Sequence, residues 1–349
     1  MSLSFEARQK VTYALLKEMK KRTENPIVTI SNKFDISKQT IYRYAQTLEK
    51  EGFIRVDRSG KSNVYSLSER EVHKSFNIDG LEEDVVWRDY VLPLIKDVPK
   101  NVLQVCSYGF TEMLNNAIDH SDAKKVYIDV TEDAVSIEFM IRDYGIGIFT
   151  KIQQALGLED PKHSILELAK GKFTTDPARH SGEGIFFTSR MFDLFYIRSC
   201  ELQFLSERNK GKDYLYEDLD KEDLKKGTCV IMEIEKDSDV VIKDVFDMFT
   251  AKDDESFGFS KTYIPVRLAK HEGEMLVSRS QAKRLIRRFD RFMEVILDFK
   301  DVTEIGQAFA DELFRVFPSD HPNVELIPKN MSEDVHKMVM RAMSNRTIQ

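Results

Sequence analysis

The chain has 349 residues, of which 42% are hydrophobic and 32% charged. This is the composition of a globular protein that is too long for one ordinary core, so we expect two or three domains. No apolar run approaches the roughly 18 residues that cross a bilayer, and the N-terminus lacks the apolar core of a signal peptide. These features predict a cytoplasmic protein without membrane contact. The three cysteines, Cys106, Cys200 and Cys229, show no metal-ligand spacing, which predicts free thiols and no zinc site.

The charge is distributed unevenly along the chain. Residues 1–70 contain 14 Lys and Arg against 8 Asp and Glu, a net charge of +6, and the remainder contains 38 against 51, a net charge of −13. A basic segment on an acidic body indicates that one end of the chain meets nucleic acid or another polyanion.

The basic segment has the pattern of three helices followed by a hairpin. Apolar residues recur at helical spacing from Phe5 to about residue 22, where "TENP" ends the helix, and a second short helix ends near residues 34–35. A third helix follows, with Ser37 placed to cap it and Gly52 to stop it. Its outward residues near the N-terminal half are Lys38, Gln39, Thr40 and Arg43.

After Gly52, "FIRVDRSGKSNVYSL" alternates and turns at "RSGK", with Arg58 and Lys61 at its tip. Three helices and this hairpin resemble the winged helix-turn-helix domains of bacterial regulators over residues 5–68. The resemblance implies DNA binding, with Lys38, Gln39, Thr40 and Arg43 near the bases and Arg58 and Lys61 near phosphates. The alternative is a small helical module that makes protein contacts.

The central part opens with a polar stripe in "FTEMLNNAIDHSDA". Glu112, Asn116 and Asp119 follow at spacings of four and three, which place them on one face of a helix. Alone, such a stripe is a solvated helix face. Two strand-like runs come next, and the second ends in "DYGIGI" from Asp143, where glycines allow a tight turn and the close approach of a flat ligand.

Two further motifs follow in order. "HSGEGIFFTSRMFD" places Gly182 and Gly184 before a helix whose first amides could meet an anion, and "GTCVIMEIE" is a strand that begins at Gly227 and Thr228. In this order, the four motifs resemble the GHKL ATPase superfamily over residues 84–236. The closest motif style is that of the anti-sigma-factor serine kinases.

This resemblance implies an ATP and Mg²⁺ site. By motif position, Asn116 would hold Mg²⁺, Glu112 would be the general base on water, and Asp143 would accept a hydrogen bond from the adenine amino group. The remaining nucleotide-binding residues that the resemblance implies are Gly145, Gly147, Lys172, Gly182, Gly184 and Thr228. The stretch between the glycine motifs, with Lys170, Lys172 and Arg179, matches the mobile ATP lid of the superfamily; otherwise it is a solvated loop with one short helix.

The last part alternates strands and helices, which predicts a small α/β domain. Arg284, Arg287, Arg288 and Arg291 form a basic helix face, interpreted as solvated, or alternatively as a site for anionic partners. Over about residues 262–345 the pattern resembles a STAS-like domain of unknown function. Where related proteins carry a phosphorylated serine, this chain has Gly306, Gln307 and Ala308, and Thr303 is the nearest hydroxyl.

The sequence thus predicts a multidomain α+β protein: a winged helix (1–70), a linker (71–83), a GHKL α/β sandwich with a mixed sheet covered by helices (84–236), a connector (237–261) and a STAS-like domain (262–349). The expected function is an ATP-binding regulator that couples Mg·ATP binding and slow hydrolysis to DNA binding, and to a protein partner or a second copy through the STAS-like domain. The alternatives are a protein serine/threonine kinase with an external substrate and a switch that binds ATP without chemistry.

Overall fold

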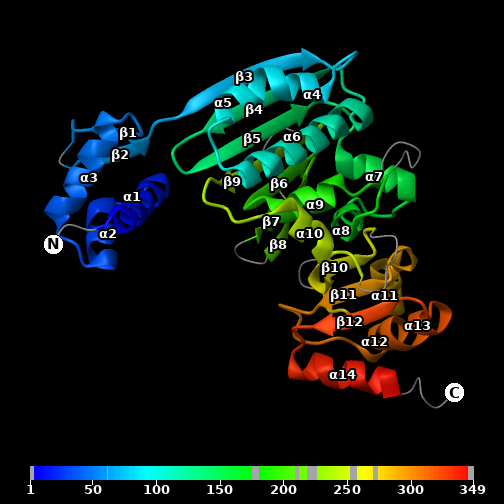
Figure 1. Cartoon of the computed structure of the whole chain (residues 1–349). Coiled ribbons are helices and arrows are strands. Elements are labelled where there is room, and N and C mark those ends of the chain that lie inside the picture. Colours follow the sequence, from blue (N-terminus) through cyan, green and yellow to red (C-terminus); the bar gives the residue numbers. More distant parts are fainter. Residues whose placement is uncertain are drawn as a thin grey trace.

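The computed structural model describes residues 4–60, 62–174, 181–208, 212–217, 226–251, 258–269 and 274–344. Three regions follow one another along the chain: an N-terminal module, a central seven-stranded sheet with helices, and a C-terminal three-stranded sheet with helices (Figure 1). Lys61 and Arg179 lie outside the described residues. Within the described ranges, no helix combines the length and the apolar character that a bilayer crossing needs.

The N-terminal module has the expected three helices and hairpin. Its elements are α1 (Phe5–Lys20), α2 (Pro26–Phe34), α3 (Lys38–Lys50), β1 (Ile54–Asp57) and β2 (Val64–Leu67). The Ser37 hydroxyl accepts a hydrogen bond from the Thr40 amide at 3.3 Å, as a helix cap does. Ile41, Ala45 and Leu48 turn inward and are buried in one small core, which leaves the polar face of α3 outward.

The central sheet has the strand order β3-β4-β5-β9-β6-β7-β8. Its strands are β3 (Arg70–Asn77), β4 (Lys125–Glu132), β5 (Ser136–Asp143), β6 (Leu194–Ser199), β7 (Leu202–Glu207), β8 (Lys212–Glu217) and β9 (Thr228–Glu235). Every neighbouring pair is antiparallel, so the expectation of a mixed sheet is wrong. The resemblance implied a mixed sheet, but β9 inserts between β5 and β6 and runs opposite to both. Residues 70–77, most of which were assigned to a linker, form the edge strand β3.

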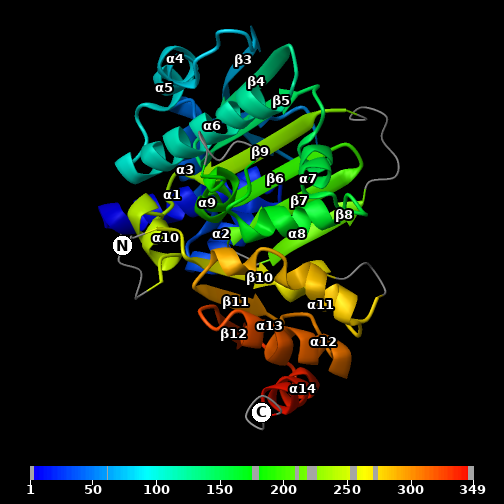
Figure 2. The same cartoon turned by 90° about the vertical axis from the view of Figure 1, so that its right-hand side faces the viewer.

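Helices cover one face of this sheet (Figure 2). They are α4 (Glu83–Val86), the π-helical turn η1 (Trp87–Val91), α5 (Leu92–Ile95), α6 (Lys100–His120), α7 (Ile148–Leu156), α8 (His163–Lys170), α9 (Gly184–Met191) and α10 (Ile242–Met248). Alternate residues of the strands, such as Phe139 of β5 and Met232 of β9, are buried in the same core as Phe110 of α6, whose ring centroid lies 5.8 Å from that of Phe139. This period-two burial produces a two-layer core beneath α6.

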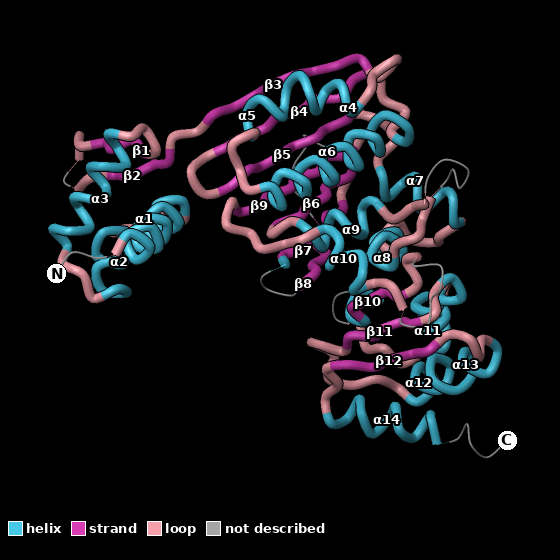
Figure 3. The backbone as a smooth tube through the Cα atoms, in the orientation of Figure 1, coloured by secondary structure: helices cyan, strands magenta, loops and turns pink. Residues whose placement is uncertain are grey.

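The C-terminal region alternates strands and helices (Figure 3). Its parallel sheet has the order β10-β11-β12. The elements are β10 (Lys261–Pro265), the 3₁₀ turn η4 (Val266–Ala269), α11 (Arg279–Ile286), the 3₁₀ turn η5 (Phe289–Arg291), β11 (Glu294–Asp298), α12 (Gln307–Asp311), the π-helical turn η6 (Glu312–Val316), α13 (Phe317–Asp320), β12 (Glu325–Lys329) and α14 (Glu333–Ser344). The run "GEMLVS" was expected to be a strand, but its described residues, 274–278, contain only an isolated bridge, from Leu276 to Ile305.

Helix α1 docks the N-terminal module on the central sheet through ion pairs. The Lys20 ammonium lies 2.9 Å from a carboxylate oxygen of Asp133 and 2.7 Å from one of Glu233. One turn before Lys20 on the same helix, the Lys17 ammonium lies 2.7 Å from a carboxylate oxygen of Glu235. The basic module and the acidic body therefore meet directly, which accounts for part of the charge asymmetry of the chain.

Candidate functional site: a cavity at the end of β5

A cavity of about 350 Å³ opens among α6, the end of β5, α7 and α9. The predicted site residues that line it are Glu112, Asn116, Asp143, Gly182, Gly184 and Thr228. They come from four separate motifs spread over more than 100 residues of sequence. Apolar side chains, among them Ile141, Ile152 and Val230, and further polar residues form the rest of the wall, so the cavity has both apolar and polar lining.

Asp143 is the most deeply buried polar group of the cavity. It ends β5 and is 4% exposed. Its Oδ1 accepts hydrogen bonds from the amides of Gly145 at 2.8 Å and Thr228 at 3.3 Å. Burial raises the pKa of this carboxyl from 3.8 to about 6, and the two amides oppose that shift. Among the described residues the second carboxylate oxygen has no hydrogen-bond partner, so it can accept a hydrogen bond from a ligand.

Thr228, the first residue of β9, is hydrogen-bonded to Ile148, the first residue of α7. Its Oγ1 accepts a hydrogen bond from the Ile148 amide at 3.0 Å. Asp143 and Ile148 flank the glycine turn, so Thr228 bonds to both ends of it. The turn is therefore held as one rigid edge of the cavity.

Glu112 and Gly184 meet across the cavity floor, where α6 packs against α9. A Cβ on Gly184 would overlap the Glu112 carboxylate and lie 2.9 Å from its Cδ. A side chain at position 184 would therefore require the Glu112 carboxylate to move from this place. Amides at that helix start and a carboxylate beside it form a site where an anionic group and a water could lie together.

Asn116 lies one helical turn after Glu112 and lines the same cavity. Its amide oxygen is a hard donor of the kind that Mg²⁺ takes. Among the described residues, no group of three or more His, Cys, Asp and Glu could hold a metal by itself. The Asn116 amide oxygen could supply one ligand to a Mg²⁺ ion whose other ligands come from a phosphate and water.

Three glycines shape the cavity through backbone packing. Gly145 lies against the backbone of Ser121, where a Cβ would lie 2.6 Å from the carbonyl carbon. Gly147 takes φ of 85° at the start of α7, and Gly182 takes φ of 73° against the backbone of Phe173. Gly182 lines the cavity itself, and Gly145 and Gly147 are in the turn after Asp143.

Lys172, expected among the nucleotide-binding residues, is not one of the cavity-lining residues. Its ammonium donates to the Arg291 carbonyl at 3.0 Å and lies over the rings of Phe259 and Phe292. The alternative interpretation of this stretch was a solvated loop with one short helix. Helix α8 is such a short helix, but it is not solvated, because Ser164–Lys170 are all buried. The C-terminal region packs on this segment.

The basic face formed by Arg284, Arg287, Arg288 and Arg291 is solvated only in part. Arg287 and Arg291 are exposed, as interpreted, whereas Arg284 is half-buried and Arg288 is 9% exposed. Arg284 and Arg288 contact His163 and Glu167 of α8. Arg287 and Arg291 donate to the carbonyls of Leu156 and Lys172, on either side of that helix. Charge along a helix does not reveal which neighbour covers it, so the sequence pattern could not separate these two cases.

Several lining residues were missed by the sequence reasoning: Asn115, His120, Lys151, Phe173 and Thr174. Lys151 is the only Lys or Arg among the described lining residues, and its ammonium donates to the His120 carbonyl at 2.7 Å. Its position four residues after Gly147, in the first turn of a helix, was the available signal. Helix α7 had not been predicted there.

The residues expected to contact DNA differ in solvent exposure and in whether they are already paired. Lys38, Gln39 and Arg43 are exposed on α3, and Thr40 is partly exposed. Arg58 instead forms two hydrogen bonds to the Glu49 carboxylate, at 2.7 and 2.6 Å. That pairing reduces what Arg58 can offer a phosphate.

Comparison with known protein families identifies the C-terminal region. Residues 281–336 match the family described as STAS-like domain of unknown function (DUF4325). The C-terminal region therefore contains a STAS-like domain, within the strand and helix alternation from α11 to α14. No curated protein matches the chain.

Proposed function

We propose that the cavity binds Mg·ATP and that the chain is an ATP-binding regulator. The observation that carries the proposal is the convergence of Asp143, Glu112, Asn116 and Thr228 on one cavity whose wall is partly apolar. Asp143 supplies a buried acceptor for an amino group, and the start of α9 at Gly184 supplies backbone amides for phosphates. The resemblance of the four motifs to the GHKL superfamily agrees with this division of the cavity.

Each end of the cavity has its own chemistry in this proposal. Asp143 and Thr228 hold the adenine against the apolar part of the wall, and Asn116 orients the metal beside the phosphates. A bound Mg²⁺ would supply charge neutralisation on the phosphate oxygens. Glu112, next to Gly184, is placed to accept a proton from an attacking water.

The N-terminal module supports a DNA-binding role, as a winged helix would have. Exposed Lys38 and Arg43 are on α3, and α1 makes the ion pairs to the sheet. The two roles use different helices of the module, so docking to the body leaves the polar face of α3 for a duplex. ATP occupancy would then bias DNA binding through the module's attachment to the sheet.

Nucleotide binding and turnover of the purified full chain test the proposal. Asn116→Ala should abolish Mg·ATP binding in calorimetry, whereas Glu112→Ala should keep binding and slow phosphate release. Asn77→Ala, an exposed asparagine in β3, serves as the matched control and should change neither. Equal affinity of Asn116→Ala and the parent would overturn the site.

The γ-phosphate of labelled ATP separates the chemical outcomes. Free phosphate supports hydrolysis, and label on protein, with the exposed Thr303 as the first position to inspect, supports a kinase. Tight binding without either product supports a switch that only holds ATP.

A further inference from the structure

Helix α8 carries two fully buried charged side chains at the boundary of the central and C-terminal regions. Lys170 is 0% exposed and Glu167 is 2% exposed. Their ammonium and carboxylate lie 2.7 Å apart. Charged groups are almost never this buried unless they are paired and hydrogen-bonded, so a specific arrangement must hold them.

The C-terminal region completes the pairing. The Arg288 guanidinium donates to Glu167 Oε2 at 2.9 Å and to the Gly171 carbonyl at 2.6 Å. The Lys170 ammonium donates to the carbonyls of Arg284 at 3.2 Å and Arg287 at 2.9 Å. The three charged groups, Glu167, Lys170 and Arg288, are called the boundary cluster below.

The local backbone explains why those carbonyls are available. Helix α11 ends at Ile286, and Arg288 takes φ of 64°, so the last carbonyls of the helix have no partners within it. A lysine at a helix C-terminus satisfies them and also meets the negative end of the helix dipole. Burial lowers the pKa of Lys170 to about 8, and the Glu167 carboxylate opposes that shift.

The opposite side of the same segment is a wall of the nucleotide cavity. Leu168, two residues before Lys170, and Phe173, three residues after it, both line the cavity. Gly171 between them packs on Phe259, where a Cβ would lie 2.6 Å from the ring. The segment from Leu168 to Phe173 thus has the cavity on one side and the C-terminal region on the other.

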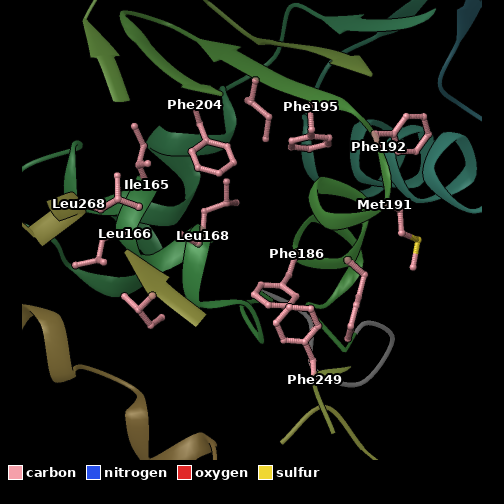
Figure 4. Close-up of a cluster of buried hydrophobic side chains, with 14 of the residues drawn as sticks. Ile165, Leu166, Leu168, Phe186, Met191, Phe192, Phe195, Phe204, Phe249 and Leu268 are labelled. Carbon is pink, nitrogen blue, oxygen red and sulfur yellow. The ribbon is translucent and has the colours of Figure 1, made fainter. Parts of the chain in front are cut away.

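Aromatic packing extends this contact. Phe186 of α9 lines the cavity and lies 4.5 Å from Phe259 and 4.8 Å from Phe249, measured between ring centroids. Figure 4 shows Phe186 and Phe249 together, and Leu268 of η4 beside Ile165 and Leu166 of α8. Apolar packing alone would already join the two regions. The buried charged groups fix the orientation in which the regions meet, and their burial costs desolvation free energy.

We infer that the boundary cluster is an interdomain latch, in which Arg288 and Lys170 are positioning residues through which the STAS-like region holds the wall of the cavity. The consequence for ATP rests on the proposed function. If the wall must be in place for the ligand to bind, domain docking and nucleotide binding are coupled, and the coupling acts in both directions. The STAS-like region is then part of the nucleotide site rather than an independent module.

Hydrogen exchange and nucleotide affinity of the full chain test the latch. Arg288→Gln should speed amide exchange over residues 163–174 and weaken Mg·ATP binding roughly 5- to 150-fold, the usual range of coupling between sites. Arg279→Gln, the same change at an exposed position of α11, is the matched control and should alter neither. Arg288→Lys keeps the charge but lacks the planar guanidinium that donates to two acceptors. Its amide exchange rate and its Mg·ATP affinity should therefore lie between those of Arg288→Gln and the parent.

The outcomes are distinguishable. Unchanged exchange over residues 163–174 in Arg288→Gln overturns the latch, whatever happens to affinity. Faster exchange with unchanged affinity overturns the positioning role. If the parent does not bind Mg·ATP, the proposed function fails, and the exchange measurement alone decides whether the latch exists. Should Arg288→Gln fail to fold, Lys170→Met preserves the shape and the Glu167–Arg288 pair, and the same two readouts apply.

Discussion

The Cα of Gly145 lies against the backbone of Ser121, so a Cβ on it would overlap the Ser121 carbonyl oxygen. That oxygen also accepts a hydrogen bond from the Ile146 amide at 2.8 Å. The glycine turn after β5 and the end of α6 are thereby joined, and these two segments carry Asp143 and Asn116. The geometry of the cavity depends on a contact between two backbones.

Gly145→Ala should therefore destabilise the fold. Because the overlapping atoms are backbone, neither partner can move as a flexible side chain would, and we expect the free energy of unfolding to fall by about 2 to 4 kcal/mol. Denaturant unfolding measures this change. Gly60→Ala is the matched control, since its nearest neighbour to a Cβ is 3.7 Å away. Equal losses in the two variants would contradict the close approach.

Gly145 also illustrates what the sequence could and could not predict. The motif "DYGIG" was correctly located at the end of a strand, but the sequence suggested that its glycines make room for a flat ligand. The structure assigns Gly145 to a contact with a backbone 24 residues earlier. Local periodicity and capping predict elements such as α3, whereas the reason for a glycine depends on which distant segment packs there.

Strand β3 and the burial of helix α8 were missed for related reasons. Edge strands carry charged side chains that discourage further pairing, so "REVHKSFN" shows little apolar alternation. Lys170 was assigned to a mobile lid by the resemblance, with a solvated loop and one short helix as the alternative, and lysine is normally exposed. Its burial depends on Glu167 and on carbonyls more than 110 residues later, and that information is tertiary.

Asp143→Asn should stabilise the apo protein at neutral pH. The pKa of this carboxyl is raised from 3.8 to about 6, so keeping it ionised in the native state at pH 7 costs about 3 kcal/mol at most. Asparagine retains an oxygen for the Gly145 and Thr228 amides, so we expect a gain of about 1 to 3 kcal/mol in the free energy of unfolding.

The stability gain from Asp143→Asn should depend on pH. Between pH 3.8 and about 6 the native state binds more protons than the unfolded state, so this group's penalty shrinks as pH falls. The gain from Asp143→Asn, measured by denaturant unfolding, should therefore be smaller at pH 5 than at pH 7. A gain that grows toward acid pH would show that Asp143 is not the titrating group. The same variant should lose Mg·ATP binding, which calorimetry at pH 7 measures.

Lys151→Met should weaken Mg·ATP binding about tenfold, because one charge-assisted hydrogen bond to a phosphate contributes roughly 1.5 kcal/mol. Its ammonium is the only Lys or Arg charge that the described part of the cavity wall contributes. Calorimetry with ATP and with adenosine tests the assignment, since the adenosine affinity should stay the same. Lys243→Met changes an exposed lysine of α10 and is the control. An equal loss for adenosine would place Lys151 away from the phosphates.

Lys20→Glu should release the N-terminal module from the sheet. The new carboxylate would face Asp133 and Glu233, which now lie 2.9 and 2.7 Å from the Lys20 ammonium. Small-angle X-ray scattering should show a larger radius of gyration. Lys10→Glu makes the same charge change at an exposed position of α1 and should leave the radius unchanged. Combining Lys20→Glu with Glu233→Lys should restore compactness; a radius that stays large would mean that the pair does not hold the module.

Arg43→Ala should weaken binding of duplex DNA more than Arg58→Ala. Arg43 is exposed on α3, whereas the Arg58 guanidinium is held by the Glu49 carboxylate at 2.7 and 2.6 Å and must leave that partner to meet a phosphate. If Arg43 contacts a phosphate, its loss lowers the slope of log affinity against log salt by about one. Fluorescence anisotropy over a salt series measures both quantities. Glu49→Ala frees Arg58, so it should increase affinity and give Arg58→Ala in that background a full effect; no change from Glu49→Ala would mean that the hairpin tip does not meet DNA.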